Sequence, residues 1–377
     1  MPEPLRNTLL TTHPGKFVYT VLTLFLNAAR LPLWMIYFIP SVLRQNPKWT
    51  WKQAVRVRVV RAFLYWCSQV EMITPFDLTS GAEKDQWVNL SPVDSRYYTG
   101  VASGDPSIRP SKTGATWYPA VPTTTPTKVV LHFHGGAFVI GDGRIEDAGF
   151  LTGAFLKHAK VNYVCSVNYR LASNDGGRFP AALQDAITSY VYLVDALKIH
   201  PKDITFSGDS AGANLVFALL KYIADNGKTV GLEAPGAAWL WSPWVDPVGG
   251  NARFSESPNE PTDYISPAFG AWGARCYLPL KETDLTNSYI DILHHPFKTE
   301  TPLYFSVGEN EMLLHDDFVT AERFEQLGNN VTKSLEARCP HDTILVGAKT
   351  GFEREACEAA QKAGIWLDGI VSRNMKG

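Results

Sequence analysis

The segment Gly208-Asp-Ser-Ala-Gly212 places a serine between pairs of small or acidic residues in an otherwise apolar region. Residues 203–207 before it have the character of a short buried strand, and residues 213–220 after it are typical of the first turns of a helix. A serine on such a tight strand-to-helix turn has its hydroxyl exposed for nucleophilic attack. Glycine is needed on both sides because the two backbones pass close to each other there. Ser210 is therefore the candidate nucleophile.

A second glycine-rich segment follows the apolar residues 128–133, which predict a buried strand. That strand ends in His134-Gly135-Gly136, a loop whose backbone N–H groups are able to converge on one point. We expect the N–H groups of Gly135 and Gly136, with that of Ala211 after the nucleophile, to form an oxyanion hole. Losing one such donor costs about 10²–10³ in rate. Alone, the two glycines would equally suit a flexible turn; their pairing with Ser210 favours the oxyanion hole.

A serine hydroxyl needs a general base to take its proton. Such a turn resembles that of α/β-hydrolases, in which the acid and then the histidine follow the serine along the chain. The histidines after Ser210 are His294, His295, His315 and His341. Residues 331–338 predict a strand, residues 339–342 a loop and the region from about Glu353 a helix, which puts His341 at a strand end. His294 and His295 precede Pro296 in a polar surface connection, so His341 is the candidate base.

The orienting acid is expected on the loop before that strand. Residues 302–307 predict a strand, and Glu311 follows it in the loop 308–313. Glu311 would accept the Nδ1–H of His341 and stabilise the imidazolium. Asp316 and Asp317 are alternatives, although the first turn of a helix over 316–327 accounts for acids there. Glu309 is expected to be a solvated loop residue.

These segments resemble the hormone-sensitive-lipase-like family of α/β-hydrolases over about residues 125–350. The similar stretches are His134-Gly-Gly-Ala-Phe138 with Gly141, Asn168–Ala172, Phe179–Asp185, Gly208–Asn214, and Ser242-Pro-Trp244 with Asp246. The resemblance implies carboxylic-ester hydrolysis through an acyl-enzyme, with no metal and no organic cofactor. The chain departs from the family at Glu311, where many members have Asp. It also departs at Ala137, where glycine is common and where a methyl group beside the acyl pocket would restrict bulky esters.

Composition excludes several other classes. The chain has 377 residues and a net charge of −2, which argues against nucleic-acid binding. The sequence contains no Cys-x-x-Cys or His-x-x-x-His spacing, so no metal site is expected. The five cysteines are scattered, so they do not predict a disulfide framework. Cys339, two residues before His341, is expected to be a structural thiol or to form one bridge to Cys357.

The N-terminal 70 residues are basic, with nine Lys/Arg and one acid, Glu3. They contain an apolar segment, residues 17–40, interrupted by Arg30 and Pro32. A span of 23 residues is long enough to cross a bilayer, but a central Arg is costly there, so a hairpin or an interfacial anchor are alternatives. A cleaved signal peptide fits poorly because no small-x-small site follows. Thr50-Trp-Lys-Gln53 predicts a capped helix to about Val70 whose basic and aromatic residues suit an anionic membrane surface or a cap over the site.

The location of the catalytic part relative to the membrane stays open. Six basic residues after the apolar segment, against Arg6 and Lys16 before it, favour a cytosolic catalytic part. Two glycosylation sequons, at Asn89 and Asn330, would matter only in a lumen. We expect association with a membrane, that of the endoplasmic reticulum, while apolar patches on the cap would allow a homodimer.

The alternation of strands and helices predicts an α/β-hydrolase fold with a mostly parallel sheet and a helical cap. We expect residues 1–75 to form a membrane-associated segment with cap helices, and residues 76–377 the catalytic domain, with a cap insertion at about 248–296. The expected function is hydrolysis of a small-to-medium apolar ester, of the steryl acetate or acylated secondary metabolite type. Acyl transfer or lactone chemistry by the same residues is an alternative, and a non-catalytic small-molecule receptor is an alternative of another class.

Overall fold

The computed structural model describes residues 8–374, so Glu3 and Arg6 lie outside the described residues. The strands are β1 (Trp87–Leu90), β2 (Thr113–Tyr118), β3 (Val129–Phe133), β4 (Tyr163–Asn168), β5 (Ile204–Asp209), β6 (Ala237–Trp241), β7 (Leu303–Gly308) and β8 (Val331–Glu336). The helices are α1 (Thr8–Thr11), α2 (Gly15–Tyr37), α3 (Trp51–Val70), α4 (Ile145–Ala154), α5 (Ala181–Val191), α6 (Ala211–Val230), α7 (Gly250–Phe254), α8 (Pro267–Tyr277), α9 (Asp284–Ile290), α10 (Leu314–Gln326), α11 (Thr343–Thr350) and α12 (Glu353–Asn374). Short 3-10 and π segments complete the connections.

Within the described residues the strands form one sheet in the order β1-β2-β4-β3-β5-β6-β7-β8. From β4 to β8 every neighbouring pair is parallel. The β1–β2 and β2–β4 pairs are antiparallel, so the two entry strands form an antiparallel edge. The mostly parallel sheet expected from the sequence is confirmed. Because the carboxyl ends of parallel strands lie on one edge, the loops after β3, β5, β7 and β8 meet there.

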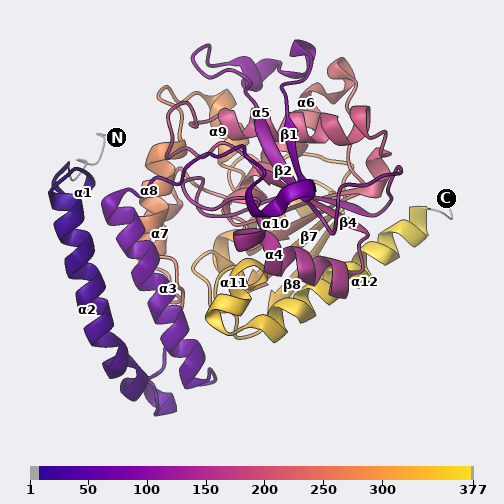
Figure 1. Cartoon of the computed structure of the whole chain (residues 1–377). Helices are drawn as coiled ribbons and strands as arrows, with labels where there is room; N and C mark the ends of the chain where they lie inside the picture. Colours follow the sequence, from indigo (N-terminus) through magenta and orange to yellow (C-terminus); the bar gives the residue numbers. More distant parts are fainter. Residues whose placement is uncertain (1–7, 375–377) are drawn as a thin grey trace.

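Helices cover both faces of the sheet, and the period of two along a strand sends alternate side chains to each (Figure 1). Val129, Leu131 and Phe133 of β3 pack in a core with residues of α5, α6 and α10. Val130 faces the other way, into a core with residues of α4, α11 and α12. Burial on both faces explains why four of the five residues of β3 are apolar.

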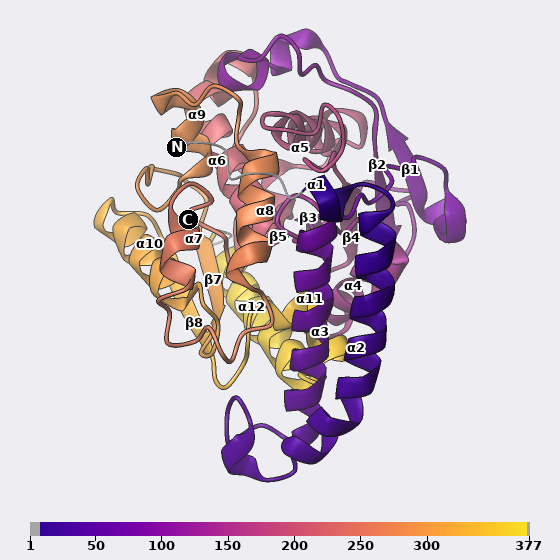
Figure 2. The same cartoon turned by 90° about the vertical axis from the view of Figure 1, so that its left-hand side faces the viewer.

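The N-terminal helices α2 and α3 run side by side along one flank of the sheet domain (Figures 1 and 2). Helix α3 begins with the expected capping box: the Thr50 hydroxyl accepts the Gln53 N–H (3.2 Å), and the Gln53 side chain accepts the Thr50 N–H (2.8 Å). On its other side α3 contacts α8 and α11. The Arg61 guanidinium donates to the carbonyls of Glu260 and Asp263 at 2.7 and 2.8 Å. Arginine therefore ties the N-terminal helices to the 248–296 segment.

The apolar segment near the N-terminus is one uninterrupted helix, α2, with Pro32 inside it and no buried residue. The hairpin alternative is therefore wrong. Among the described residues α2 is the one helix long and apolar enough to cross a bilayer by length and composition, properties that a signal sequence shares. The division of the chain at residues 75 and 76 stays a prediction.

Strand β1 ends at Leu90, and the short 3-10 helices Ser95–Tyr97 and Gly100–Ser103 follow it. Pro92 cannot donate to a strand ladder, and the Asp94 carboxylate caps the first of these turns. The helix expected from about Glu353 is α12, which begins at that residue, but the preceding helix α11, from Thr343 to Thr350, was not predicted. Its β-branched residues are modest helix formers, and packing of Ile344 against the sheet outweighs that propensity.

Candidate active site

Ser210 lies on the tight turn between β5 and α6, with φ 51° and ψ −114°. Such a conformation costs about 1–3 kcal/mol for a residue with a side chain and persists only where its surroundings hold it. The Ser210 N–H donates to the Trp241 carbonyl at 2.8 Å, and its own carbonyl accepts the Trp244 N–H at 3.0 Å. Ser210 is partly exposed, whereas its neighbours Asp209 and Ala211 are buried. The turn therefore presents the hydroxyl-bearing residue to the exterior of a rigid core.

The glycines of this turn are required by space. A Cβ on Gly208 would lie 2.2 Å from the Gly212 carbonyl oxygen, and a Cβ on Gly212 would lie 1.9 Å from the Phe133 carbonyl oxygen. Both obstacles are backbone atoms that have no freedom to move aside. The helix α6 can thus begin directly against the end of β3, which places Ser210 beside the glycine loop.

The glycine loop lies against the serine turn. A Cβ on Gly135 would meet the Asp209 carboxylate at 2.2 Å and the Ser210 Cβ at 3.2 Å, and Gly136 has φ 100°, which favours glycine. His134 anchors the loop: its ring stacks on Tyr169 at 4.3 Å, and its carbonyl accepts the Tyr169 hydroxyl at 2.6 Å. Across residues 8–374, the N–H groups of Gly135, Gly136 and Ala211 donate to no other backbone carbonyl outside the regular helices and strands. Three donors are thus available next to Ser210.

The methyl group of Ala137 faces α8. It lies 2.6 Å from the position that a Cβ on Gly273 of α8 would take, and Ala137 is buried. Ala137 therefore packs α8 closely over the glycine loop. Its effect on bulky esters stays a prediction.

The loops after β7 and β8 bring Glu311 and His341 together. The Asn310 N–H donates to the Cys339 carbonyl at 2.8 Å, and a Cβ on Gly308 would lie 2.5 Å from the Pro340 carbonyl oxygen. His341 Nδ1 then lies 3.3 Å from Glu311 Oε2, and both side chains are almost fully buried. Burial lowers the pKa of His341, but the adjacent carboxylate of Glu311 outweighs this effect, so the pKa is raised overall. This is the electrostatics of a base whose protonated form is stabilised.

The alternative acids have other partners. Asp316 binds Arg253 at 2.9 Å, and Glu309 accepts the Arg338 N–H at 2.7 Å. Asp317 is fully buried, and burial together with the neighbouring Glu311 raises its pKa well above the usual range, which disfavours its charged form as an orienting acid.

The other histidines do not share this environment. His294 binds Asp291 at 2.9 Å and His295 lies beside the same carboxylate, and both side chains remain partly exposed. His315 is exposed on α10. Of the four histidines after Ser210, His341 is the one buried beside a carboxylate.

Sequence reasoning missed two residues of the 248–296 segment. Asp263 is fully buried and accepts the Met312 N–H at 2.7 Å, next to Glu311. Burial raises the pKa of Asp263 to about 6, although the positive charge of His341 counteracts this. The ring of Tyr264 lies 5.7 Å from that of His341. No motif marks either residue, because only the packing of an irregular segment brings them to the site.

A second buried carboxyl pair flanks the site. Asp209 Oδ1 lies 3.1 Å from His132 Nε2 in the sheet. The pKa of Asp342, the residue after His341, is raised well above its usual range by burial and by Asp209. The Asp342 N–H donates to the Ser242 hydroxyl at 3.0 Å. These contacts fix the backbone on either side of Ser210 and His341.

Metal-ligand spacing occurs in one group among the described side chains, Asp246, Asp291 and His294, whose ligand atoms lie within 4.8 Å of one another. Asp246 already binds Arg253 at 2.6 Å, and Asp291 binds His294. These contacts satisfy the group without an ion.

Cys339 and Cys357 are both free thiols. The expectation of a bridge between them is wrong, and Cys339 is a buried thiol. Burial raises its pKa well above the usual thiol range, which keeps it unreactive.

The sheet order, the serine turn and the glycine loop lead to one family. A family model described as the alpha/beta hydrolase fold matches residues 130–345. The chain belongs to this family. An AB hydrolase superfamily protein of Schizosaccharomyces pombe is 29% identical over 226 residues, 58% of this chain and 64% of that protein. An arylesterase of Saccharolobus solfataricus is 35% identical over 116 residues, 30% of this chain and 36% of that protein.

The alignments with these two relatives and with the acetyl-hydrolase below span between about a third and two thirds of the relatives' own length. Among solved structures, an esterase from the archaeon Pyrobaculum calidifontis matches 84% of this chain and 94% of its own with a TM-score of 0.61 at 18% identity. A hormone-sensitive lipase from a metagenome library matches 68% of this chain and 82% of its own with a TM-score of 0.56 at 23% identity. The α/β-hydrolase fold expected from the sequence is confirmed.

Proposed function

We propose that this protein is a serine ester hydrolase in which Ser210, His341 and Glu311 form the catalytic triad. The observation that carries the proposal is the buried His341–Glu311 pair at 3.3 Å on the same sheet edge as the strained, partly exposed Ser210. If these positions served only packing, an alanine or a leucine would meet that need better. A buried imidazole with a raised pKa beside a nucleophile turn is the arrangement of a general base.

In the proposed reaction the Ser210 hydroxyl oxygen attacks the ester carbonyl while His341 takes its proton. The oxyanion is held by the N–H groups of Gly135, Gly136 and Ala211. His341 then gives the proton to the leaving alcohol, and an acyl-enzyme remains on Ser210. Water attacks the acyl carbon with His341 again as base, which releases the acid and restores the hydroxyl. Glu311 keeps the imidazole in the correct tautomer and stabilises its charged form.

The substrate proposed is a small-to-medium apolar ester, of the steryl acetate or acylated secondary metabolite type. Support comes from the buried aromatic residues of the cap segment, Tyr264, Phe269 and Trp272. A relative named acetyl-hydrolase from Streptomyces hygroscopicus, 34% identical over 119 residues, is in keeping with a short acyl group.

We further propose that α2 attaches the protein to a membrane. Its exposed residues include Phe17, Leu24, Phe25 and Ile36, each more than half exposed. Removing such side chains from water yields about 25 cal/mol per Å², which a bilayer provides. The endoplasmic-reticulum location and the homodimer stay predictions.

The test is steady-state hydrolysis of p-nitrophenyl esters from acetate to dodecanoate by the detergent-solubilised full chain. Ser210→Ala is expected to abolish turnover and labelling by a fluorophosphonate, whereas Ser255→Ala, an exposed serine in the cap segment, should change neither. Retained turnover in Ser210→Ala would overturn the proposal. Absence of both turnover and labelling in folded wild-type protein that still binds an apolar ligand would favour the receptor alternative.

A further inference from the structure

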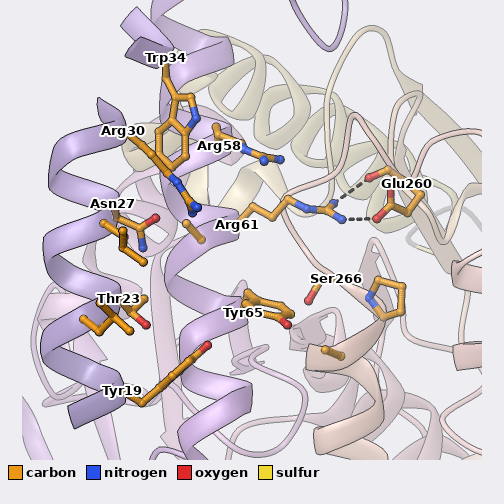
Figure 3. Close-up of a pocket in the computed structure, with 15 residues that line it drawn as sticks. Tyr19, Thr23, Asn27, Arg30, Trp34, Arg58, Arg61, Tyr65, Glu260 and Ser266 are labelled. Atoms are coloured by element: carbon orange, nitrogen blue, oxygen red, sulfur yellow. Dashed lines mark hydrogen bonds and ion pairs between the residues drawn. The ribbon is translucent and has the colours of Figure 1, made fainter. Parts of the chain in front are cut away.

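Helix α2 has its polar and apolar sides reversed relative to a helix of a water-soluble protein. Its polar and amphipathic side chains, Tyr19, Thr23, Asn27, Arg30 and Trp34, recur every three or four residues and so share one face. In Figure 3 these side chains lie on the side of α2 that faces α3 and the cap segment. The Trp66 indole of α3 also donates to Thr20 at 3.2 Å. The polar stripe therefore points toward the protein, with Leu22 and Leu26 beside it, while strongly exposed apolar side chains such as Phe17, Leu24 and Phe25 remain on the helix surface.

A groove of about 540 Å³ lies along this polar stripe. It is closed by α2 on one side, by Arg58, Arg61 and Tyr65 of α3 on the other, and by Glu260 and residues 266–268 of the cap segment. This volume is within the range of small-molecule sites. Its walls combine apolar side chains of α2 with polar and aromatic ones, so an amphipathic ligand suits it.

The groove holds more positive than negative charge. Figure 3 shows Arg30, Arg58 and Arg61 gathered between the helices and the cap segment. Arg61 is neutralised by Glu260. Within residues 8–374, neither Arg30 nor Arg58 has an ion-pair partner. Arg58 keeps contact with solvent and lies 5.6 Å above the Trp34 ring. Partial burial, then Arg61 and Arg30, lower the pKa of Arg58, as expected where like charges are crowded.

We propose that this groove binds the headgroup of an anionic phospholipid, with the phosphate held by Arg30 and Arg58 and an acyl chain beside Leu22 and Leu26. The inference rests on the proposed membrane contact of α2 and adds to it a defined lipid site. Arg30 and Arg58, which form no ion pair among the described residues, match a phosphate, which Arg binds through paired N–H donors. An apolar wall next to them matches the acyl region of the same molecule.

The packing of α3 favours α2 lying in the membrane surface rather than crossing it. Helix α3 contacts α2 on one side and α8 and α11 on the other. If α2 crossed the bilayer, its companion α3 would carry the exposed Lys52 and Arg56 into the hydrocarbon, and charges there are costly. In the surface orientation the outer side chains of α2 enter the acyl region while Arg30 and Arg58 lie at the level of the phosphates.

The experiment is flotation of the full chain with vesicles of phosphatidylcholine alone and of phosphatidylcholine with phosphatidylserine. Arg30→Gln/Arg58→Gln is compared with Lys52→Gln/Arg56→Gln, which removes the same charge from another face of α3. Arg56 lies beside Gly351 at the end of α11, away from the groove. Hydrolysis of a soluble ester and circular dichroism report folding of both variants, and inorganic phosphate is titrated as a soluble competitor.

We expect the groove variant to lose about 30-fold in affinity for the anionic vesicles, about fivefold for each charge, and to bind neutral vesicles as before. The control variant should lose less than fivefold. Equal losses in both variants would show diffuse charge attraction and overturn the proposal, as would equal binding of wild type to the two vesicle types. Displacement by inorganic phosphate alone would assign the groove to a small phosphorylated ligand instead.

Two readouts keep this result separate from the earlier proposals. Failure of the wild-type protein to bind neutral vesicles would contradict the membrane contact of α2, while catalysis does not enter the flotation measurement. If Arg30→Gln/Arg58→Gln fails to fold, native mass spectrometry of wild type with short-chain phosphatidylserine or phosphatidylcholine decides: one tightly held anionic lipid supports the site, and equal retention of both contradicts it.

Discussion

Replacing Glu311 by Gln tests the proposed triad through its least exposed contact. Gln keeps the size of the side chain but removes the negative charge 3.3 Å from His341 Nδ1. In a serine-protease triad the corresponding change costs about 10⁴ in kcat, or about 5.5 kcal/mol of transition-state stabilisation. Here Asp263 remains nearby with a pKa of about 6, so it is mostly ionised at pH 7 and replaces part of the lost field. We therefore expect a loss of about 10³ in kcat.

The pH dependence gives the same variant a second signature. His341 must be neutral to act as base, so kcat/KM rises with pH through its pKa. Glu311 is the largest influence raising that pKa, whereas burial lowers it. Without Glu311 the pKa of His341 falls, and the acid limb of the profile moves to lower pH. The profile is measured with p-nitrophenyl acetate under conditions in which the protein stays folded.

Matched variants separate the carboxylates. Glu309→Gln makes the same chemical change at a surface residue that binds the Arg338 N–H, and it should retain activity within about twofold. Adding Asp263→Asn to Glu311→Gln should deepen the loss toward about 10⁴, because both charges near His341 are then gone. A loss below tenfold in Glu311→Gln, with an acid limb that does not move, would refute the role assigned to Glu311.

Three further outcomes are expected. Asp317 has a raised pKa, so above about pH 4 the native state disfavours the ionised carboxylate that the unfolded chain adopts, at a cost of about 1.4 kcal/mol per pKa unit. Asp317→Asn should therefore stabilise the protein at neutral pH, and the gain, measured by urea unfolding, should vanish as the pH falls to 4. A pH-independent change in stability would contradict this. Gly212→Ala should destabilise by more than about 3 kcal/mol because its Cβ meets a backbone oxygen at 1.9 Å, whereas Gly153→Ala in α4, with open space, should not. Arg61→Gln breaks charged hydrogen bonds worth about 1.5–3 kcal/mol each that hold the chain at Glu260 and Asp263. Limited proteolysis near residues 260–263 should become faster and activity should fall. Unchanged cleavage would argue against the contact between α3 and this segment.

Local sequence predicted the elements that depend on neighbouring residues. The serine turn needs only two glycines, a strand before and a helix after, all within residues 204–230. The same holds for the capping box at Thr50, whose two hydrogen bonds join residues three apart. The strand β3 could be placed because both faces of a parallel sheet are covered, which leaves four of its five residues apolar.

Chain order and strand-end position also predicted Glu311 and His341, but not their environment. The raised pKa of Asp317 beside Glu311 and the burial of Asp263 beside His341 depend on segments that meet only after the sheet has formed. A carboxyl group has the same appearance in a sequence whether it will be solvated or buried. The helix α11 was not predicted for a similar reason, because packing of Ile344 rather than helix propensity stabilises it.

The N-terminal helix shows the same boundary between the two kinds of information. Its length and its apolar composition, with Arg30 as the one charge inside the span, are properties of the sequence, and they indicated a membrane-associated helix with more than one arrangement. Tertiary structure decided that the helix is continuous and that its polar stripe faces α3. It also decided that Arg30 meets Arg58 across a groove, since two side chains 28 positions apart share an electrostatic environment only when the fold brings their helices together.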